Sequence, residues 1–225
     1  MISTKNIQES TGGGIQKLIQ PGNIKAKILG VELEPYKFIP DSYQVILSLE
    51  TEELGDEFEG FLINKDDPSM GYHKGQIGKV KSSEYAYADA TTKGGNEIKR
   101  DAEMLKFLKN ICTSLGGKAL KWLDKQDSKH ATIESLFEQF NIDQPFEDIY
   151  LDYCIAGKEY LNKKGYPAYD LFLPKFVKGG APFSNEEQKP FPVITYSEAN
   201  HIRRKKNPTV SSFASSNASD NDIDL

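Results

Sequence analysis

Aromatic and basic residues alternate in three stretches of the sequence, and this combination of side chains can bind single-stranded nucleic acid. Cationic side chains neutralise phosphates, while unpaired bases stack on aromatic rings at roughly 1 to 3 kcal/mol per base. The stretches are PYKF at 35–38, GYHKGQIGKVKSSEYAY at 71–87 and KEYLNKKGYPAY at 158–169. The candidate binding residues are Tyr36, Lys37, Phe38, Tyr72, Lys74, Lys79, Lys81, Tyr85, Tyr87, Lys158, Tyr160, Lys163, Lys164 and Tyr166. Tyrosine also packs well in strands without any ligand, and Tyr169, which shares a face with Leu171, is expected in the core.

Groupings that could perform catalysis are weaker than this pattern. The histidines and cysteines have no metal-ligand spacing: His73, His130, His201, Cys112 and Cys154. Gly78-Lys79 lacks the upstream spacing of a phosphate-binding loop. Asp66 and Asp67 fit a turn better than a metal-dependent nuclease, because no further carboxylate and lysine stand at motif spacing. The sequence therefore favours a protein without catalytic residues, bound metal or cofactor, and a nuclease or recombination mediator remains the weaker alternative.

Charge is distributed unevenly along the chain. The 225 residues carry a formal net charge of −5, which by itself argues against nucleic acid as a partner. Residues 41–60 contain seven acids and no lysine or arginine, whereas residues 150–206 contain ten basic and six acidic residues. An acidic protein can thus present a basic face. We expect the acids from Glu50 to Glu59 to lie at a turn away from that face.

Composition also indicates where the protein works. The hydrophobic fraction is 38%, and no apolar run approaches the length needed to span a bilayer. The N-terminal segment has neither the basic nor the apolar region of a signal peptide. Cys112 and Cys154 both stand within apolar patterns, as is typical of buried, reduced thiols. We therefore expect a cytoplasmic protein without a disulfide and with no membrane association.

The residue pattern predicts strands, then helices, then a hairpin. Period-two alternation predicts strands at 23–33, with a bulge at Gly30, at 43–50 and at 58–64, forming an antiparallel meander. A polar loop of roughly 30 residues follows. An apolar stripe predicts a helix at 98–115 ending at Gly116 and Gly117, and two shorter helices follow at 119–126 and 132–140, with Thr132 as a capping residue. The hairpin comprises strands at 149–155 and 169–173 with a turn at 162–165, and an edge strand is compatible with PVITY at 192–196.

This order of elements resembles the OB-fold single-stranded DNA-binding proteins, especially those that bacteriophages encode for replication and recombination. The segments NIKAKILGVEL, RDAEMLKFLKNICTSLGG and GKEYLNKKGYPAYDLFLP carry the resemblance, together with the acidic ending DNDIDL. It implies a mainly β fold: a five-stranded OB-fold barrel with helices between strands 3 and 4 and a disordered acidic C-terminal tail. The expected parts are an N-terminal arm at 1–20, the barrel domain at 21–200 with its helical insertion at about 97–140, and a basic run and tail at 201–225.

The resemblance also implies a function. Such a protein coats and protects single-stranded DNA without sequence preference during replication, recombination and repair, in the host cytoplasm if phage-encoded. Self-association is compatible with it. The tail would recruit replication or recombination proteins through Asp220, Asp222, Ile223, Asp224 and Leu225. The basic run at 203–206 would contact phosphates or the protein's own tail. The main alternative is a β-rich interaction or virion protein that binds no nucleic acid.

Overall fold

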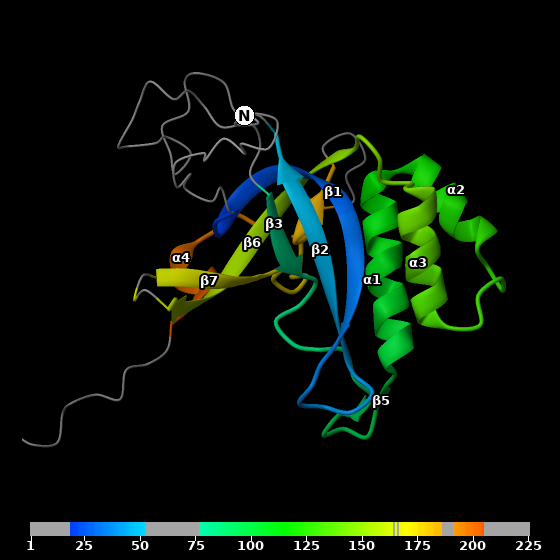
Figure 1. Ribbon diagram of the computed structural model, residues 1–225, viewed down its shortest axis with the longest axis horizontal. Coiled ribbons are helices and arrows are strands. Elements are labelled where there is room, and N and C mark those ends of the chain that lie inside the picture. Colours follow the sequence, from blue (N-terminus) through cyan, green and yellow to red (C-terminus); the bar gives the residue numbers. More distant parts are fainter. Residues whose placement is uncertain (1–18, 53–76, 164, 166, 186–190, 205–225) are drawn as a thin grey trace, which may run out of the picture.

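The strands form a closed five-stranded barrel, so the protein is mainly β with a few helices (Figure 1). The computed structural model describes residues 19–52, 77–163, 165, 167–185 and 191–204. The barrel strands are β1 (Gly22–Pro35), β2 (Tyr43–Thr51), β3 (Ile77–Lys81), β6 (Tyr150–Leu161) and β7 (Pro167–Phe172). They follow the order β1-β2-β3-β7-β6, and β6 closes the barrel by pairing with β1. All neighbours are antiparallel except β3 and β7, which are parallel where Lys81 faces Phe172.

The first strand is long and bends, and it pairs with a different strand along each half. Its N-terminal half faces β6 and its C-terminal half faces β2. The register with β2 shifts between Ile28 and Gly30, which is the bulge that the sequence predicts. The side chain of Asn141, from the helical layer, bonds to both backbone groups of Val31: the Val31 N–H donates to Oδ1 at 2.8 Å, and Nδ2 donates to the Val31 carbonyl at 2.6 Å. The bulge is therefore tied to a helix.

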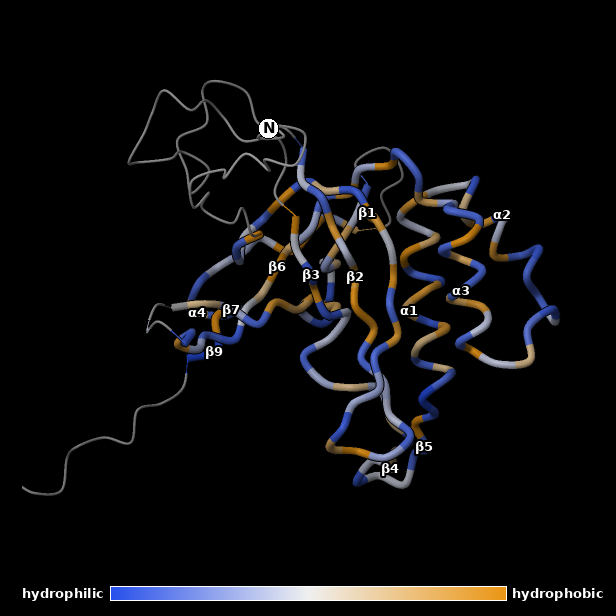
Figure 2. Tube along the Cα trace, viewed as in Figure 1, coloured by the Kyte–Doolittle hydropathy of each residue, from blue (hydrophilic) through white to orange (hydrophobic). Residues whose placement is uncertain are grey.

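Alternating residues of the strands fill the barrel. Val45, Leu47 and Leu49 of β2 point inward, as the sequence predicts, together with Leu151, Tyr153 and Ile155 of β6. Tyr169 is half-buried and packs against this core, as predicted. Figure 2 shows apolar positions recurring along the strands, whereas the connection between the helices on the right is hydrophilic.

The position of the third barrel strand differs from the sequence prediction. The expected strand at 58–64 lies outside the described residues, and β3 occupies residues expected to form a polar loop. The pattern was missed because only Gly78 and Val80 point inward from β3, so its apolar signal is very short. Gly78 permits close packing, since a Cβ there would lie 2.9 Å from the Cβ of Ile19. Ile19, at the end of the predicted arm, is buried in the core.

Three helices lie beside the barrel, between β3 and β6 in the chain (Figure 1). They are α1 (Arg100–Leu115), α2 (Gly117–Lys125) and α3 (Ile133–Asp143). α1 ends at Gly116, whose φ of 98° is easily adopted only by glycine, and the Thr132 side chain caps α3 by accepting from the Ser135 N–H. The sequence predicted both the C-terminal end of α1 and the N-terminal end of α3. None of the helices in the described ranges is long and apolar enough to cross a membrane.

The chain after β7 forms a C-terminal strap, residues 174–185 and 191–204, along β6. Its short elements are β8 (Phe183–Ser184), α4 (Glu198–His201) and β9 (Ile202–Arg203). β8 pairs with Asp152 and Tyr153, and β9 runs parallel to Gly157 and Lys158. The predicted edge strand at 192–196 is reduced to a single bridge between Ala181 and Val193. A separate two-stranded hairpin, β4 (Ala90–Thr91) and β5 (Glu97–Ile98), precedes α1.

Candidate nucleic-acid interface

The loop between β1 and β2 presents an aromatic tip. The Tyr36 N–H donates to the Ser42 carbonyl at 2.9 Å, which closes the loop at its base. The rings of Tyr36 and Phe38 meet edge to face, with centroids 5.4 Å apart, and the Lys37 ammonium lies 4.8 Å from the centre of the Phe38 ring. Phe38 is 71% exposed. A base could stack on this ring while Lys37 neutralises the adjacent phosphate.

The lysines of β3, of which Lys79 is exposed and Lys81 is half-buried, are already paired. Lys79 donates to both carboxylate oxygens of Glu32 on β1, at 2.7 and 2.9 Å. Lys81 donates to Asp170 on β7 at 2.6 Å. Each pair bridges two barrel strands, so the face formed by β1, β2, β3 and β7 is largely neutral. A phosphate on this face would have to compete with a carboxylate for its lysine.

The two tyrosines after β3 have different environments. Tyr87 forms a bridge with Tyr43 through two backbone hydrogen bonds, and its hydroxyl accepts from Ser82 at 3.1 Å. Burial raises the pKa of the Tyr87 hydroxyl. Tyr87 is therefore part of the packing, whereas Tyr85 is 64% exposed and offers its ring to solvent.

The hairpin between β6 and β7 carries the third candidate cluster. Lys158, Tyr160 and Lys163 are exposed there, and the Gly165 N–H donates to the Asn162 carbonyl at the predicted turn. No ion pair of Lys158 or Lys163 is recorded within the described part of the chain. These lysines differ from those of β3 because their charges are not neutralised by a neighbouring described residue.

Two contacts link the segments that carry the three clusters. The bridge between Tyr43 and Tyr87 joins the first loop to the segment after β3, and β3 lies next to the end of β7 at Phe172. In Figure 1 the first loop lies at the bottom, the hairpin points to the left, and the segment after β3 descends between them. Exposed rings and lysines thus border a strand face whose own lysines are paired with carboxylates.

No protein-family model, curated protein or solved structure matches this chain. The interface is therefore interpreted from its own geometry.

Several candidate residues lie outside the described residues. They are Tyr72, Lys74, Lys164, Tyr166, Asp66, Asp67, His73, Lys205, Lys206 and the five tail residues Asp220, Asp222, Ile223, Asp224 and Leu225.

The described acids of the 41–60 stretch lie mainly at the far end of β2 from the aromatic loop. Glu50 pairs with Lys27 at 3.2 Å and Glu52 pairs with Lys25 at 3.0 Å, across the β1–β2 ladder. The hydrogen bond to Glu50 raises the pKa of Lys27. Asp41 is the exception, because it lies in the aromatic loop, where its carbonyl accepts a hydrogen bond from Arg100 of α1.

Sequence reasoning missed Arg100, which supports the aromatic loop. Its guanidinium lies 4.9 Å from the centre of the Tyr43 ring and donates to the Asp41 carbonyl at 3.2 Å. It missed equally the pairing of Arg203 with Glu84 at 3.1 Å and of Arg204 with Glu159 at 3.4 Å. All these partners are far apart in the sequence, so no local spacing reveals them.

Three of the described side chains that the sequence raised for catalysis are His130, Cys112 and Cys154. Among the described residues no three His, Cys, Asp or Glu side chains gather into a metal site. His130 lies within hydrogen-bonding distance of Gln126 and Ser135. Cys112 and Cys154 are buried free thiols, as predicted, and burial raises their pKa values to about 12 and about 11. Neither thiol is a ready nucleophile near neutral pH.

Proposed function

We propose that the protein binds single-stranded DNA through an OB-fold barrel and performs no catalysis. The topology supports the fold, because β6 returns after a long connection to lie beside β1, the Greek-key order of an OB barrel. In that fold the loop after the first strand and the loop of the last hairpin flank the oligonucleotide. Here the first of these loops carries Phe38, and the second follows Tyr160 at the end of β6 and carries Lys163.

The observation that carries the proposal is the combination of exposed aromatic rings with lysines that have no ion pair among the described residues. Phe38 stands beside Lys37, Tyr160 lies between Lys158 and Lys163 in the chain, and Tyr85 lies on the segment after β3. Rings provide sequence-tolerant stacking and lysines provide phosphate contacts. The strand lysines, held by Glu32 and Asp170, contribute less to affinity than their number suggests.

A titration of the full-length protein with fluorescent oligo-dT at low and high salt tests the proposal. Affinity should fall with salt, by a slope of about 0.7 in log units for each phosphate neutralised. Phe38→Ala should weaken binding by about fivefold or more, because one stacking ring is lost. Ile142→Ala is the matched control, since Ile142 on α3 is also 71% exposed. Absent or salt-independent binding would refute the proposal.

The same titration on a chain lacking residues 208–225 examines the acidic tail. We propose that the tail recruits replication or recombination proteins and competes with DNA for the loop lysines, because three aspartates are concentrated within residues 220–224. Its removal should tighten DNA binding, most at low salt. Weaker binding would instead make the tail part of the DNA site.

A protein-binding barrel is the second candidate, and the neutral strand face favours it. The lysines there are paired, and Phe38 and Ile39 form an exposed apolar tip that a protein partner could cover. If this reading holds, Lys163→Gln leaves oligo-dT retention unchanged. The DNA-binding proposal expects Lys163→Gln to reduce both the affinity and its salt dependence.

A further inference from the structure

A groove of about 520 Å³ lies between the segment after β3 and the C-terminal strap, apart from the β1–β2 loop and the turn of the β6–β7 hairpin. We refer to it as the strap groove. Its lining includes Glu84 and Tyr85 on one wall, the 172–175 segment, and Asn200, His201 and Arg203 of the strap. The volume is within the range of small-molecule sites, which are typically about 300 to 1,000 Å³.

One wall of the strap groove is an aromatic ring that packs against no other ring. Tyr85 is 64% exposed, and no ring contact or hydroxyl hydrogen bond is recorded for it among the described residues. Exposing a large ring costs hydration free energy unless something covers it. A flat ring at the side of a groove is suited to a flat ligand such as a base.

Two cations border the same groove. No ion pair is recorded for Lys175 in the part of the chain that the structure describes. Arg203 uses one terminal nitrogen to reach Glu84 at 3.1 Å, which leaves further N–H donors of its guanidinium available. The groove thus combines a ring with donors suited to a phosphate.

The strap places a buried histidine at the groove as well. His201 is only 9% exposed, and its Nδ1 lies 2.9 Å from the backbone nitrogen and 3.0 Å from the carbonyl oxygen of Ser197. No partner of the other ring nitrogen, Nε2, is found among the described residues. Tyr196 stacks on the ring with an interplanar angle of 25° and restricts its orientation. His201 lines the groove, so Nε2 is available to a polar group of a ligand within it.

We infer that the strap groove binds one nucleotide of the single strand, with its base against Tyr85 and its phosphate between Lys175 and Arg203. The Nε2 of His201 then meets a polar group on the base edge. A ring, two cations and a buried imidazole match a nucleotide, whereas an acidic peptide would need only the cations. The inference rests on the proposed function, because it extends the path of the same bound strand beyond the barrel loops.

Photo-crosslinking to oligo-dT that carries 5-iododeoxyuridine tests the groove directly. Irradiated full-length protein is digested, and the modified residue is identified by mass spectrometry. We expect a crosslink at Tyr85 or at the adjoining strap residues. If a base stacks on the Tyr85 ring, Tyr85→Ala should weaken oligo-dT binding by about fivefold or more. Tyr85→Phe keeps the ring and should retain the affinity.

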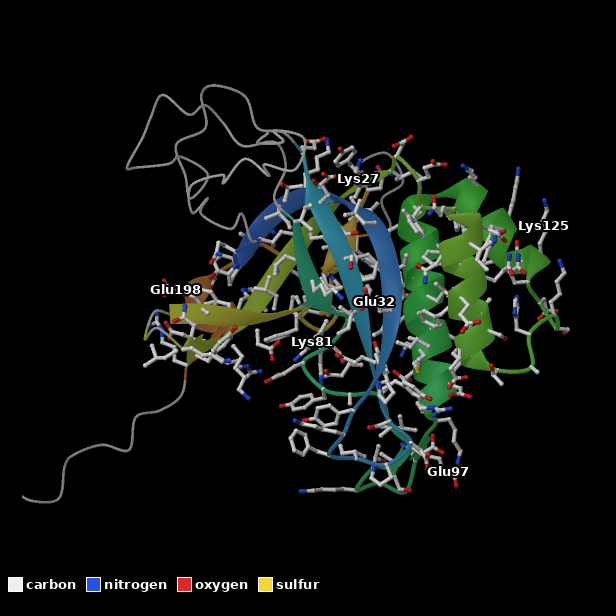
Figure 3. The ribbon with its side chains drawn as sticks, viewed as in Figure 1. Lys27, Glu32, Lys81, Glu97, Lys125 and Glu198 are labelled. Carbon is white, nitrogen blue, oxygen red and sulfur yellow. The ribbon has the colours of Figure 1, made fainter. Side chains whose placement is uncertain are left out.

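Lysine variants provide the matched comparison. Lys175→Gln should reduce the affinity and lower its salt slope by about 0.7. Lys125→Gln should change neither, because Lys125 lies on α2, at the opposite side of the molecule from Glu198 of the strap (Figure 3). Thermal unfolding of each variant checks that the fold is intact.

The outcomes separate the two proposals. If wild-type protein does not bind oligo-dT, the proposed function itself fails. If it binds and Phe38→Ala weakens it, but Tyr85 and the strap are not crosslinked and Lys175→Gln has no effect, the strap groove is refuted alone. Protection of Lys175 by an acidic peptide but not by oligo-dT would also overturn the inference.

Discussion

The lysines of the barrel strands and the lysines of the loops are in different electrostatic states. Lys79 donates to a carboxylate on β1, across the intervening strand β2, and Lys81 donates to one on the adjacent strand β7. Lys158, Lys163 and Lys175 have no recorded ion pair among the described residues. The exposed aromatic residues Phe38 and Tyr85 also stand on connections rather than on strands. Apart from Lys158 and Tyr160 near the end of β6, unpaired charge and exposed ring area are therefore available in the loops and the strap rather than on β3.

This difference assigns different tasks to the two regions. Cross-strand ion pairs on an exposed face contribute little to stability, about 0 to 1 kcal/mol each, but they keep the face close to neutral. The strands and the helical layer hold the loops in place, and under the proposed function the loops make the contacts with DNA. Substitutions in the strands and helices should then lower the free energy of unfolding, and substitutions in the loops should lower the affinity for DNA.

The largest effect is expected where the helical layer is tied to the barrel. Asn141→Ala removes the acceptor of the Val31 N–H and the donor to its carbonyl, at a strand residue that is buried. Two backbone groups without partners lower the free energy of unfolding by about 2 to 4 kcal/mol. Urea unfolding followed by circular dichroism measures this loss.

Asn110→Ala on α1 is the control, because no hydrogen bond of the Asn110 side chain is recorded among the described residues. Its unfolding free energy should change by about 0.5 kcal/mol or less. Oligo-dT affinity of folded Asn141→Ala protein should stay near the wild-type value. If Asn141→Ala is as stable as the wild-type protein, the helical layer is held to the barrel by apolar packing alone.

Local patterns revealed the elements but not their partners. Alternation predicted β1, β2 and the final hairpin, and glycine and threonine signals predicted the ends of α1 and α3. The pattern failed at β3, where one inward valine and a glycine give almost no signal. It identified Lys79 and Lys81 as candidates but could not reveal their carboxylates, because Glu32 is 47 residues from Lys79 and Asp170 is 89 residues from Lys81. Charge pairing of this kind depends on strand order, which no local spacing encodes.

Releasing a strand lysine tests the difference between strands and loops. Glu32→Gln removes the carboxylate that holds Lys79, so the lysine becomes available to a phosphate. Oligo-dT affinity should rise by roughly two- to fivefold at low salt, which corresponds to the worth of one exposed ion pair. The salt slope should steepen by about 0.7. Fluorescence anisotropy at several salt concentrations measures both quantities.

Glu103→Gln on α1 is the matched control, since Glu103 also pairs with a lysine, Lys106, at 3.8 Å. It should leave affinity and slope unchanged, because α1 lies in the helical layer and carries none of the candidate clusters. If both variants tighten binding equally, net charge rather than a released lysine accounts for the effect. Weaker binding by Glu32→Gln would show that the pair positions Lys79 for DNA and that the strand face is part of the site.

The smallest expected effect concerns a carboxylate of the helical layer, and it tests whether a charge there acts on stability without acting on DNA binding. Trp122, the single tryptophan of the chain, donates its indole N–H to Asp143 at 2.7 Å. That bond, followed by one from Gln139, lowers the pKa of Asp143 below its ordinary value of 3.8. A lowered folded-state pKa means that the interaction stabilises the protein above the ordinary value and is lost as pH falls through the lowered one.

Trp122 fluorescence should therefore stay constant from neutral pH down to about 4 and change only below 3.8. Asp143→Asn should abolish that low-pH transition and leave oligo-dT binding at neutral pH unaltered, because the loop lysines do not depend on this bond. A fluorescence transition well above pH 4, or a loss of DNA affinity in Asp143→Asn, would show that the helical layer and the interface are coupled.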